Sequence, residues 1–141
     1  MSNDSDGQNP RPPGGELFDA VERNDVAAVE ELLSRGADVN TLDPRYPQLA
    51  RPALMTAASL GYSEIVRLLL ANGADVNARD AGGGTALIWA CNDGHIDCTR
   101  LLLAAGADPG LRNNGGYTAY GRIMARNEEL MRLLEEHGGS L

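Results

Sequence analysis

The chain contains no lysine. All of its twelve basic residues are arginine, and twenty acidic residues bring the formal net charge to −8. A protein that binds nucleic acid through its bulk charge needs a dense cluster of basic side chains, so this balance argues against DNA or RNA as a partner. The absence of lysine leaves two explanations open: a GC-rich coding sequence, or avoidance of modification at lysine.

Cysteines and aromatic residues are also few, and long apolar runs are missing. Two cysteines, Cys91 and Cys98, are too few for a disulfide scaffold, which favours a reduced, cytoplasmic or otherwise intracellular setting. No stretch approaches the roughly 20 apolar residues of a membrane-spanning helix, and the polar residues 1–15 contain no secretory signal, so we expect no contact with a membrane. With only 4% aromatic residues, the core must be built from Leu, Ala, Val and Ile.

What the chain does contain is an internal repeat. The tripeptide Gly-Ala-Asp occurs at 36–38, 73–75 and 106–108, each time just after a pair of leucines, and the last two copies lie 33 residues apart. Leu54 and Leu87 are displaced by the same period. Self-similarity at this period predicts a stack of small units rather than a globule around one site. Such a stack offers a long surface and rarely a catalytic pocket.

Each unit is predicted to contain two short helices. In the third unit we expect them at roughly 86–93 and 97–105, with a break at Gly94. Gly106 follows the second helix, at a position where the left-handed backbone conformation favours glycine. In the second unit, the run at 65–70 places its apolar side chains on one broad helical face. Helices this short are not stable alone, so each must bury its face against the next unit.

The order of these features resembles the ankyrin repeat. The resemblance is carried by Thr-Ala-Leu at 85–87, Gly-His at 94–95, three leucines at 101–103 and Gly-Ala-Asp-Val-Asn at 73–77. It covers about residues 16–141. It implies an all-α fold: an ankyrin-repeat solenoid of stacked helix-turn-helix pairs with projecting hairpin fingers.

The chain is expected to consist of a proline-rich, disordered N-terminal tail at 1–14 and an ankyrin-repeat domain at 15–141. The first repeat has no preceding finger. The last is degenerate and carries Glu135 and Glu136 beside its leucines, which suits a face turned to water. We therefore expect both end repeats to be caps of the stack. The four repeats are predicted at approximately 15–40, 41–78, 79–111 and 112–141.

The first finger is longer than the others. Gly36 and Gly73 lie 37 residues apart, four more than the regular spacing, and the extra residues fall within 41–51. Two prolines stiffen this segment. Arg45 and Tyr46 are expected near its tip, where they can meet a partner.

Catalytic groups do not come together in this pattern, because the two histidines lie in different units. Cys91, His95 and Cys98 have a spacing that could supply three metal ligands. However, the cysteines match Ala58 and Ile65 of the preceding unit, which are core positions, and buried cysteine behaves as a small hydrophobic residue. We therefore expect no enzymatic activity, no metal and no cofactor. A metal- or redox-responsive thiol pair is the alternative.

Two further motifs are interpreted as turns. Gly82–Gly84 looks like a phosphate-binding loop, but it lacks a preceding strand and a Gly-Lys-Ser/Thr ending, so we place it in the turn of a finger. The Asp-Val-Asn segments at 38–40 and 75–77 carry side chains that can hydrogen-bond the backbone. Neither motif needs a ligand.

The resemblance implies a non-enzymatic module that binds another protein along a concave surface made of fingers and first helices. Arg45, Arg51, Arg79 and Arg112 fall in or beside the fingers, whereas acidic residues concentrate in the second helices. Guanidinium groups bind carboxylates through paired hydrogen bonds, so these arginines favour an acidic or carboxylate-bearing partner segment. Two alternative roles stay open for these arginines: they can serve solubility alone, or they can bind an acidic small molecule. The residues predicted to contact the partner are Leu42, Arg45, Tyr46, Arg51, Ser59, Leu60, Arg79, Ala81, Gly82, Asn92, Asp93, Arg112, Asn114, Tyr117, Ala125 and Arg126.

Within this set the binding energy is expected to concentrate in Tyr46, Arg45, Arg79 and Tyr117, because interface hot spots are rich in Tyr, Trp and Arg. Trp89 is instead expected in the core, since its helix neighbours are apolar. The protein is expected to be a monomer.

Two narrower functions stay open. A small regulatory inhibitor of an enzyme is one, because the four-repeat inhibitors of cyclin-dependent kinases are similar in size and architecture. Their shortened first helix in the second repeat is not evident here, where 54–60 has full length. A host-directed bacterial effector is the other, which the absence of lysine permits.

Overall fold

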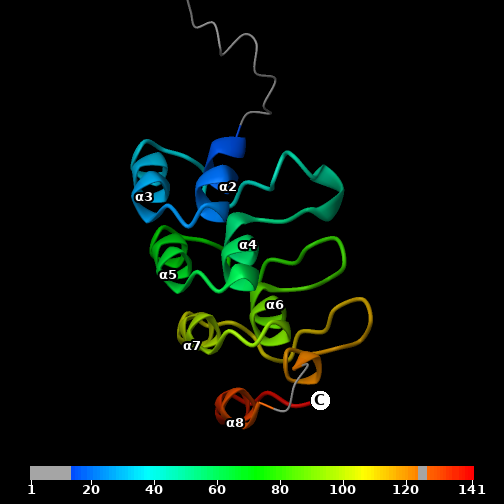
Figure 1. Cartoon of the computed structure of the whole chain (residues 1–141). Coiled ribbons are helices and arrows are strands. Elements are labelled where there is room, and N and C mark those ends of the chain that lie inside the picture. The colour runs from blue at the N-terminus through cyan, green and yellow to red at the C-terminus, as the bar shows by residue number, and fades with distance from the viewer. Residues whose placement is uncertain (1–13, 124–126) are drawn as a thin grey trace, which may run out of the picture.

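The computed structural model describes residues 14–123 and 127–141, which form helical pairs stacked on one another (Figure 1). The only strand-like pairing within these residues is an isolated bridge between Leu42 and Pro52, at the base of the first finger. The predicted all-α fold is confirmed for the described part of the chain, whereas the predicted tail at 1–14 lies outside it except for Gly14. The helices are α2 (Gly15–Glu22), α3 (Val26–Ser34), α4 (Ala53–Leu60), α5 (Ser63–Ala71), α6 (Ala86–Asn92), α7 (Ile96–Ala104) and α8 (Glu128–Glu136), and the 3-10 turns are η1 (Pro47–Leu49) and η2 (Tyr120–Arg122).

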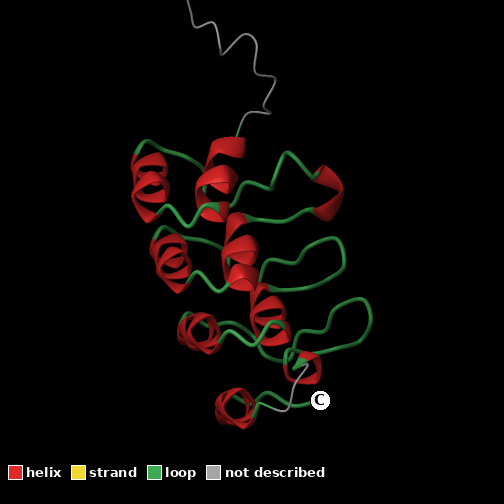
Figure 2. Cartoon of the chain, viewed as in Figure 1, coloured by secondary structure: helices red, strands yellow, loops and turns green. Residues whose placement is uncertain are grey.

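The helices form two layers. The first helices of the pairs, α2, α4 and α6, line up in one layer, and the second helices, α3, α5, α7 and α8, line up in the other (Figure 1). The loops between consecutive pairs project beyond the first-helix layer as fingers (Figure 2). We call the surface made by the fingers 41–52, 78–85 and 111–117 and by the adjoining sides of α4 and α6 the finger face.

Local chemistry sets the helix ends. The side chains of Thr85 and Asp25 accept hydrogen bonds from backbone N–H groups three residues further on, at 3.2 and 3.1 Å, and so cap α6 and α3. Gly94 and Gly106 have φ angles of 75° and 94°, so the predicted break and the predicted left-handed end are confirmed. The third unit's helices lie within one residue of the expected bounds. In the second unit α4 has full length, as expected.

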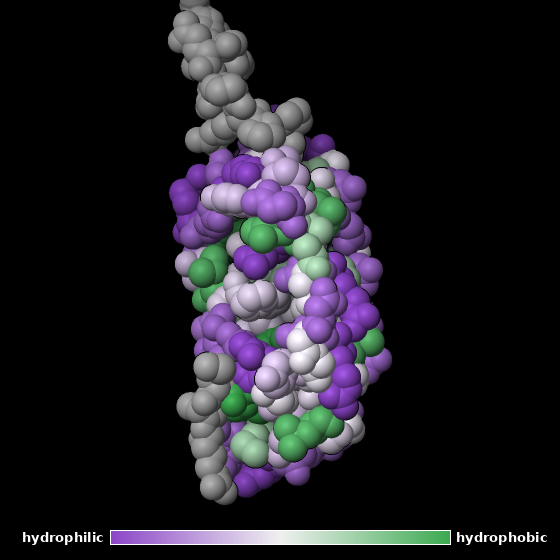
Figure 3. All heavy atoms as spheres, turned by 90° about the vertical axis from the view of Figure 1, so that its right-hand side faces the viewer, coloured by the Kyte–Doolittle hydropathy of each residue, from purple (hydrophilic) through white to green (hydrophobic). Residues whose placement is uncertain are grey.

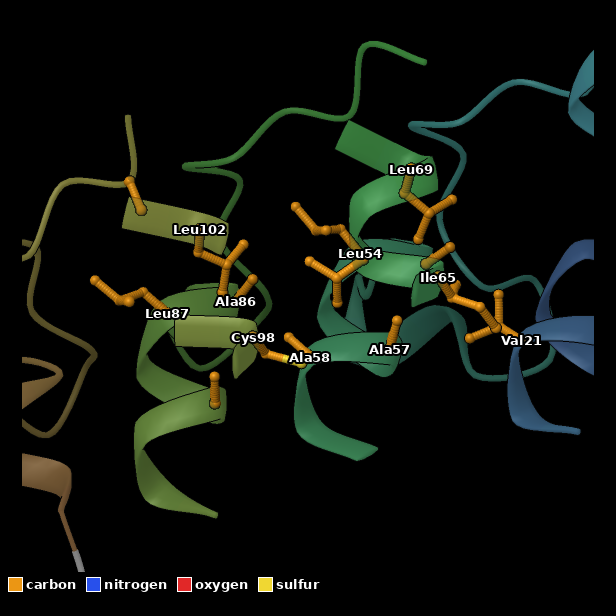
Figure 4. Packing of buried hydrophobic residues seen from close by; sticks show 14 of the residues in the cluster. Val21, Leu54, Ala57, Ala58, Ile65, Leu69, Ala86, Leu87, Cys98 and Leu102 are labelled. Atoms are coloured by element: carbon orange, nitrogen blue, oxygen red, sulfur yellow. The ribbon is translucent and has the colours of Figure 1, made fainter. Parts of the chain in front are cut away.

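The core lies between the layers and is built from small and branched aliphatic side chains. Leu54, Leu69 and Leu102 point into the space between neighbouring helices (Figure 4) and are at most 2% exposed. Ala57 and Ala58 are fully buried where α4 meets its neighbours. These small residues let the helix axes approach closely. Close approach fills the core at normal density although it contains few large aromatic side chains.

Asparagine side chains connect consecutive units. Asn40 Oδ1 accepts a hydrogen bond from the backbone N–H of Asp75 (2.8 Å), and its Nδ2 donates to the carbonyl of Gly73 (3.2 Å). Asn77 makes the equivalent bonds to Asp108 and Gly106 (2.8 and 3.5 Å). Within each turn, the side chain of Asp38 or Asp75 accepts a hydrogen bond from the backbone N–H group of the asparagine two residues later. The predicted hydrogen bonds from these side chains to the backbone are therefore confirmed. Those of the asparagines reach the backbone of the next unit.

The last unit differs from the inner ones. Its first helix is represented, within the described residues, by the short turn η2. In α8 Leu130, Leu133 and Leu134 are buried against the stack, whereas Glu135 and Glu136 are exposed. This is the distribution expected of a helix whose outer face meets water.

Candidate protein-binding site

The three fingers are joined by backbone hydrogen bonds. The N–H of Ala81 donates to the carbonyl of Leu49 (2.9 Å), and the N–H of Asn114 donates to the carbonyl of Gly82 (2.8 Å). Asn114 Nδ2 also donates to the carbonyl of Ala81 (3.2 Å). Ala81, Gly82 and Asn114, all predicted contact residues, thus hold the fingers at a set spacing, whatever else they contact.

The glycine run of the second finger serves this packing. Gly83 has a φ of 78°, and a Cβ there would lie 2.6 Å from Asn114 Oδ1 of the next finger. A Cβ on Gly84 would lie 3.0 Å from Trp89 Nε1. The predicted finger turn is confirmed at Gly83, and the close approaches give a second reason for glycine.

Arg45 occupies the centre of an ion-pair network inside the long first finger. Its guanidinium lies 2.7 Å from Asp43 Oδ2, 3.0 Å from Asp19 Oδ1 and 3.0 Å from Glu22 Oε1. Asp19 and Glu22 belong to α2, so these contacts tie the projecting finger to that helix. Arg45 was expected near the finger tip as a contact residue, but its side chain is only 21% exposed and its donors bind three carboxylates of its own chain.

The network changes the acidity of Asp43. Burial alone would raise the pKa of this carboxyl group, but hydrogen bonds from the side chain and backbone of Arg45, together with the charges of Arg45 and Arg51, outweigh it and hold the pKa below its usual value. The pKa of Arg45 is raised by hydrogen bonds from its guanidinium to Asp43 and Glu22. Both groups are therefore firmly ionised at neutral pH.

Trp89 lies on the finger face rather than in the core. Its Nε1 donates to Asp80 Oδ2 (2.9 Å), and the guanidinium of Arg51 stands 5.1 Å from its ring centre. The expectation of a core tryptophan is wrong because Trp89 has a polar tip, and Asp80 of the finger supplies a partner at the surface. The other carboxylate oxygen, Oδ1, accepts from the N–H groups of Gly82 (3.0 Å) and Gly84 (2.8 Å).

A second arginine and aromatic pair lies one unit further along. The guanidinium of Arg122 stands 5.3 Å from the ring centre of Tyr117. Its Nη2 donates to Asn92 Oδ1 at the end of α6 (2.7 Å). Tyr117 and Asn92 were predicted contact residues, but Arg122 was missed because the degenerate last repeat gave no clear alignment for it.

These two pairs flank a hollow of about 460 Å³ between the second and third fingers. Five predicted contact residues line it: Arg51, Ala81, Gly82, Asn92 and Tyr117. Figure 3 views the finger face, where hydrophobic side chains lie scattered among polar ones. The lining residues that sequence reasoning missed are Leu49, Asp80, Gly84, Ile88, Trp89, Asn113, Gly115 and Arg122.

Other predicted contact residues lie around this hollow. Tyr46 belongs to a smaller hollow of about 260 Å³ in the first finger, which Leu49 and Arg51 share. Arg79 donates to the carbonyl of Arg112, and Arg112 donates to the carbonyls of Gly116 (2.8 Å) and Leu141 (3.2 Å). These arginine side chains are thus partly used to join the fingers and the C-terminal residues.

The remaining predicted contact residues lie at the base of the first finger and at the ends of the first helices. Leu42 and Leu60 are exposed, at 49% and 42%, and Asp93 is also exposed. Ser59 donates from its hydroxyl to the carbonyl of Thr56 (3.1 Å). Ala125 and Arg126 lie outside the residues that the structure describes.

The two cysteines are core residues. Each is 1% exposed. Burial raises the pKa of Cys91 to about 12, although a hydrogen bond with Thr99 lowers it in part. Burial, together with the charge of Asp97, raises the pKa of Cys98 to about 11. No cluster of potential metal ligands occurs in residues 14–123 and 127–141. The thiols are protonated and shielded at neutral pH, which favours the packing interpretation over a metal or redox role.

Comparison with known proteins defines the class. The family described as ankyrin repeats matches residues 17–113 with three copies, so the chain belongs to the ankyrin-repeat family. Among the described helices, none has the length and apolar composition that crossing a bilayer requires.

Similar curated proteins extend well beyond the matched region. A 2-5A-dependent ribonuclease of Mus musculus is 38% identical over 72 residues, which are 51% of this chain and 9% of that protein. A putative ankyrin repeat protein of Rickettsia bellii is 35% identical over 91 residues (50% and 38%), and a putative ankyrin repeat-containing protein of Treponema pallidum is 43% identical over 70 residues (49% and 22%). The chain spans less than two fifths of the length of each of these relatives. What is shared is the repeat, a generic protein-interaction module.

Proposed function

We propose that this protein is a non-enzymatic interaction module that binds another protein through its finger face, with an acidic or carboxylate-bearing segment as the contact. One observation carries this proposal. Of the six large hydrophobic side chains that are exposed in the described residues, four lie on the fingers: Leu42, Tyr46, Leu49 and Tyr117. Exposed apolar and aromatic side chains that lie among polar groups on one face are typical of a protein-binding site.

The second helices lack this character. Arg67 on α5 pairs with Glu64 at 3.5 Å, and both side chains are more than half exposed. Arg100 on α7 pairs with Glu129 at 3.6 Å in the same way. A surface of exposed, weakly paired charges interacts well with water but offers a partner protein little apolar area to bury. This contrast supports the finger face as the binding surface.

The test compares two double variants with the wild type. Tyr46→Ala/Arg79→Ala alters the finger face, and Glu64→Ala/Arg67→Ala alters the second-helix layer. Proteins captured from the native host are quantified by mass spectrometry for all three, and thermal unfolding is measured in parallel. We expect at least one captured protein to be lost with the finger-face variant and kept with the control. Equal capture by all three, with equal stability, would rule out the finger face.

A further inference from the structure

The hollow between the second and third fingers carries an unbalanced positive charge. Its charged lining residues are Arg51, Asp80 and Arg122. The carboxylate of Asp80 already accepts three hydrogen bonds, from Trp89 Nε1 and from the N–H groups of Gly82 and Gly84. The charge of Arg51 also acts on the Asp43 carboxylate outside the hollow, but Asp43 is ion-paired with Arg45 at 2.7 Å. On a molecule with a net charge of −8, the lining of the hollow therefore has one more positive than negative side chain.

Neither arginine of the hollow forms an ion pair with another residue of the described chain. Arg51 Nε is buried without a hydrogen-bond partner, and the guanidinium contacts the face of Trp89. Arg122 donates to the neutral amide of Asn92 and contacts the face of Tyr117. A cation–π contact with an aromatic ring holds the guanidinium near the ring while leaving N–H groups that can bind an anion. By contrast, the ion pairs of Arg45 are complete within the chain.

The walls between these arginines are apolar. Leu49, Ile88, Trp89 and Tyr117 line the hollow, and Leu49 and Tyr117 are 37% and 49% exposed. A volume of about 460 Å³ admits one large side chain of a partner together with its flanking backbone. The Asp80 carboxylate in the wall disfavours a doubly charged phosphate more than a singly charged carboxylate.

We propose that this hollow binds an extended acidic segment of a partner protein, with one large apolar side chain against Trp89 and carboxylates on Arg51 and Arg122. The proposal deepens the function proposed above and rests on it. The occupant is peptide-like because the apolar walls and the two separate cations require apolar and acidic groups on one ligand.

Trp89 makes the test direct, since it is the only tryptophan of the chain and lies in the hollow. Blocked seven-residue peptides with a central leucine or phenylalanine and none, two or four flanking acidic residues are titrated while tryptophan fluorescence is recorded. We expect binding that strengthens with the number of acids and weakens with salt. Peptides with the acids replaced by their amides, or with serine at the centre, should bind about tenfold more weakly or not at all.

Three variants locate the binding. Arg51→Gln and Arg122→Gln should each weaken the acidic peptide about tenfold, whereas Arg67→Gln on α5 should leave it unchanged. Thermal unfolding of each variant is measured as well. Because Arg51 also packs on Trp89, Arg122→Gln gives an independent result if Arg51→Gln lowers stability.

Three outcomes would overturn the proposal: no acidic peptide binds, binding is insensitive to both arginine substitutions, or a phosphoserine peptide or free glutarate binds more tightly than the acidic peptide. The proposed function is judged separately. If a captured partner depends on the finger face but no acidic peptide competes with it, the hollow is wrongly assigned and the interaction function stands. If neither capture nor peptide binding depends on this face, both fail.

Discussion

At the scale of single residues, the arginines near the fingers separate into two groups. Arg45 is surrounded by Asp43, Asp19 and Glu22 and holds the long finger against α2. Arg51 and Arg122 have aromatic neighbours and form no ion pair within the described residues, although the charge of Arg51 also acts on Asp43. Substitution of Arg45 should therefore change the free energy of unfolding, whereas substitution of Arg51 or Arg122 should change the affinity for a partner.

Removal of Arg45 should destabilise the fold. In Arg45→Ala the nearly buried carboxylate of Asp43 loses its main partner, and we expect a loss of about 2 kcal/mol in the free energy of unfolding, measured with urea. Arg67→Ala, which removes an exposed pair, should cost less than about 0.5 kcal/mol. Equal effects of the two substitutions would mean that the network contributes nothing.

The same network predicts a pH dependence. The pKa of Asp43 is lower in the folded state than the ordinary value of 3.8, so its contribution is complete above that value and is lost as the pH falls through the lowered folded pKa. The wild type should therefore lose more stability than Asp43→Asn between about pH 6 and about pH 2. Urea unfolding at both pH values checks this, and parallel losses would contradict it.

The buried thiols predict the opposite behaviour at alkaline pH. The folded pKa values of Cys91 and Cys98, about 12 and about 11, lie above the ordinary value of 9.0. Their stabilising contribution is complete below that ordinary value and is lost as the pH rises through the folded ones. We expect no reaction of the native thiols with a disulfide reagent at about pH 8, and full reaction in denaturant. The Cys91→Ala/Cys98→Ala variant should lose less stability than the wild type between about pH 8 and about pH 10.5.

At the scale of elements, the helices could be predicted closely from the sequence, because a short-period pattern of leucines and glycines defines them. The side-chain contacts that the fingers make could not. Trp89 was misplaced because the partner of its indole, Asp80, lies in the preceding finger, and helical neighbours say nothing about it. The ion pairs of Arg45 could not be predicted because two of its three carboxylates lie on α2, more than twenty residues earlier in the chain.

The helix pairs are held together by their buried leucines, so truncating one should be costly. Leu69→Ala in α5 and Leu102→Ala in α7 remove fully buried side chains, and each should cost about 2–5 kcal/mol. Leu60→Ala in α4 is the matched control, since Leu60 is 42% exposed. Losses below about 0.5 kcal/mol at the buried positions, measured by urea unfolding, would contradict the stacked core.

At the scale of the whole molecule, the main contacts between the described helices lie within a unit or between neighbouring units, so stability depends on the seams between units. The first two seams carry the asparagine bridges of Asn40 and Asn77. At the corresponding place in the third unit stands Gly110, which has no side chain to reach across. The third seam is thus joined differently from the other two.

Because the third seam lacks an asparagine bridge, we expect the stack to open first at its last unit. Amide hydrogens of α8 should exchange with solvent deuterium well before those of α4 to α7, because the last unit can open without disturbing the bridged ones. Replacing Gly110 by Asn should slow exchange in α8 if the missing bridge is the cause. Uniform protection from α4 to α8 would instead mean that the molecule opens only as one piece.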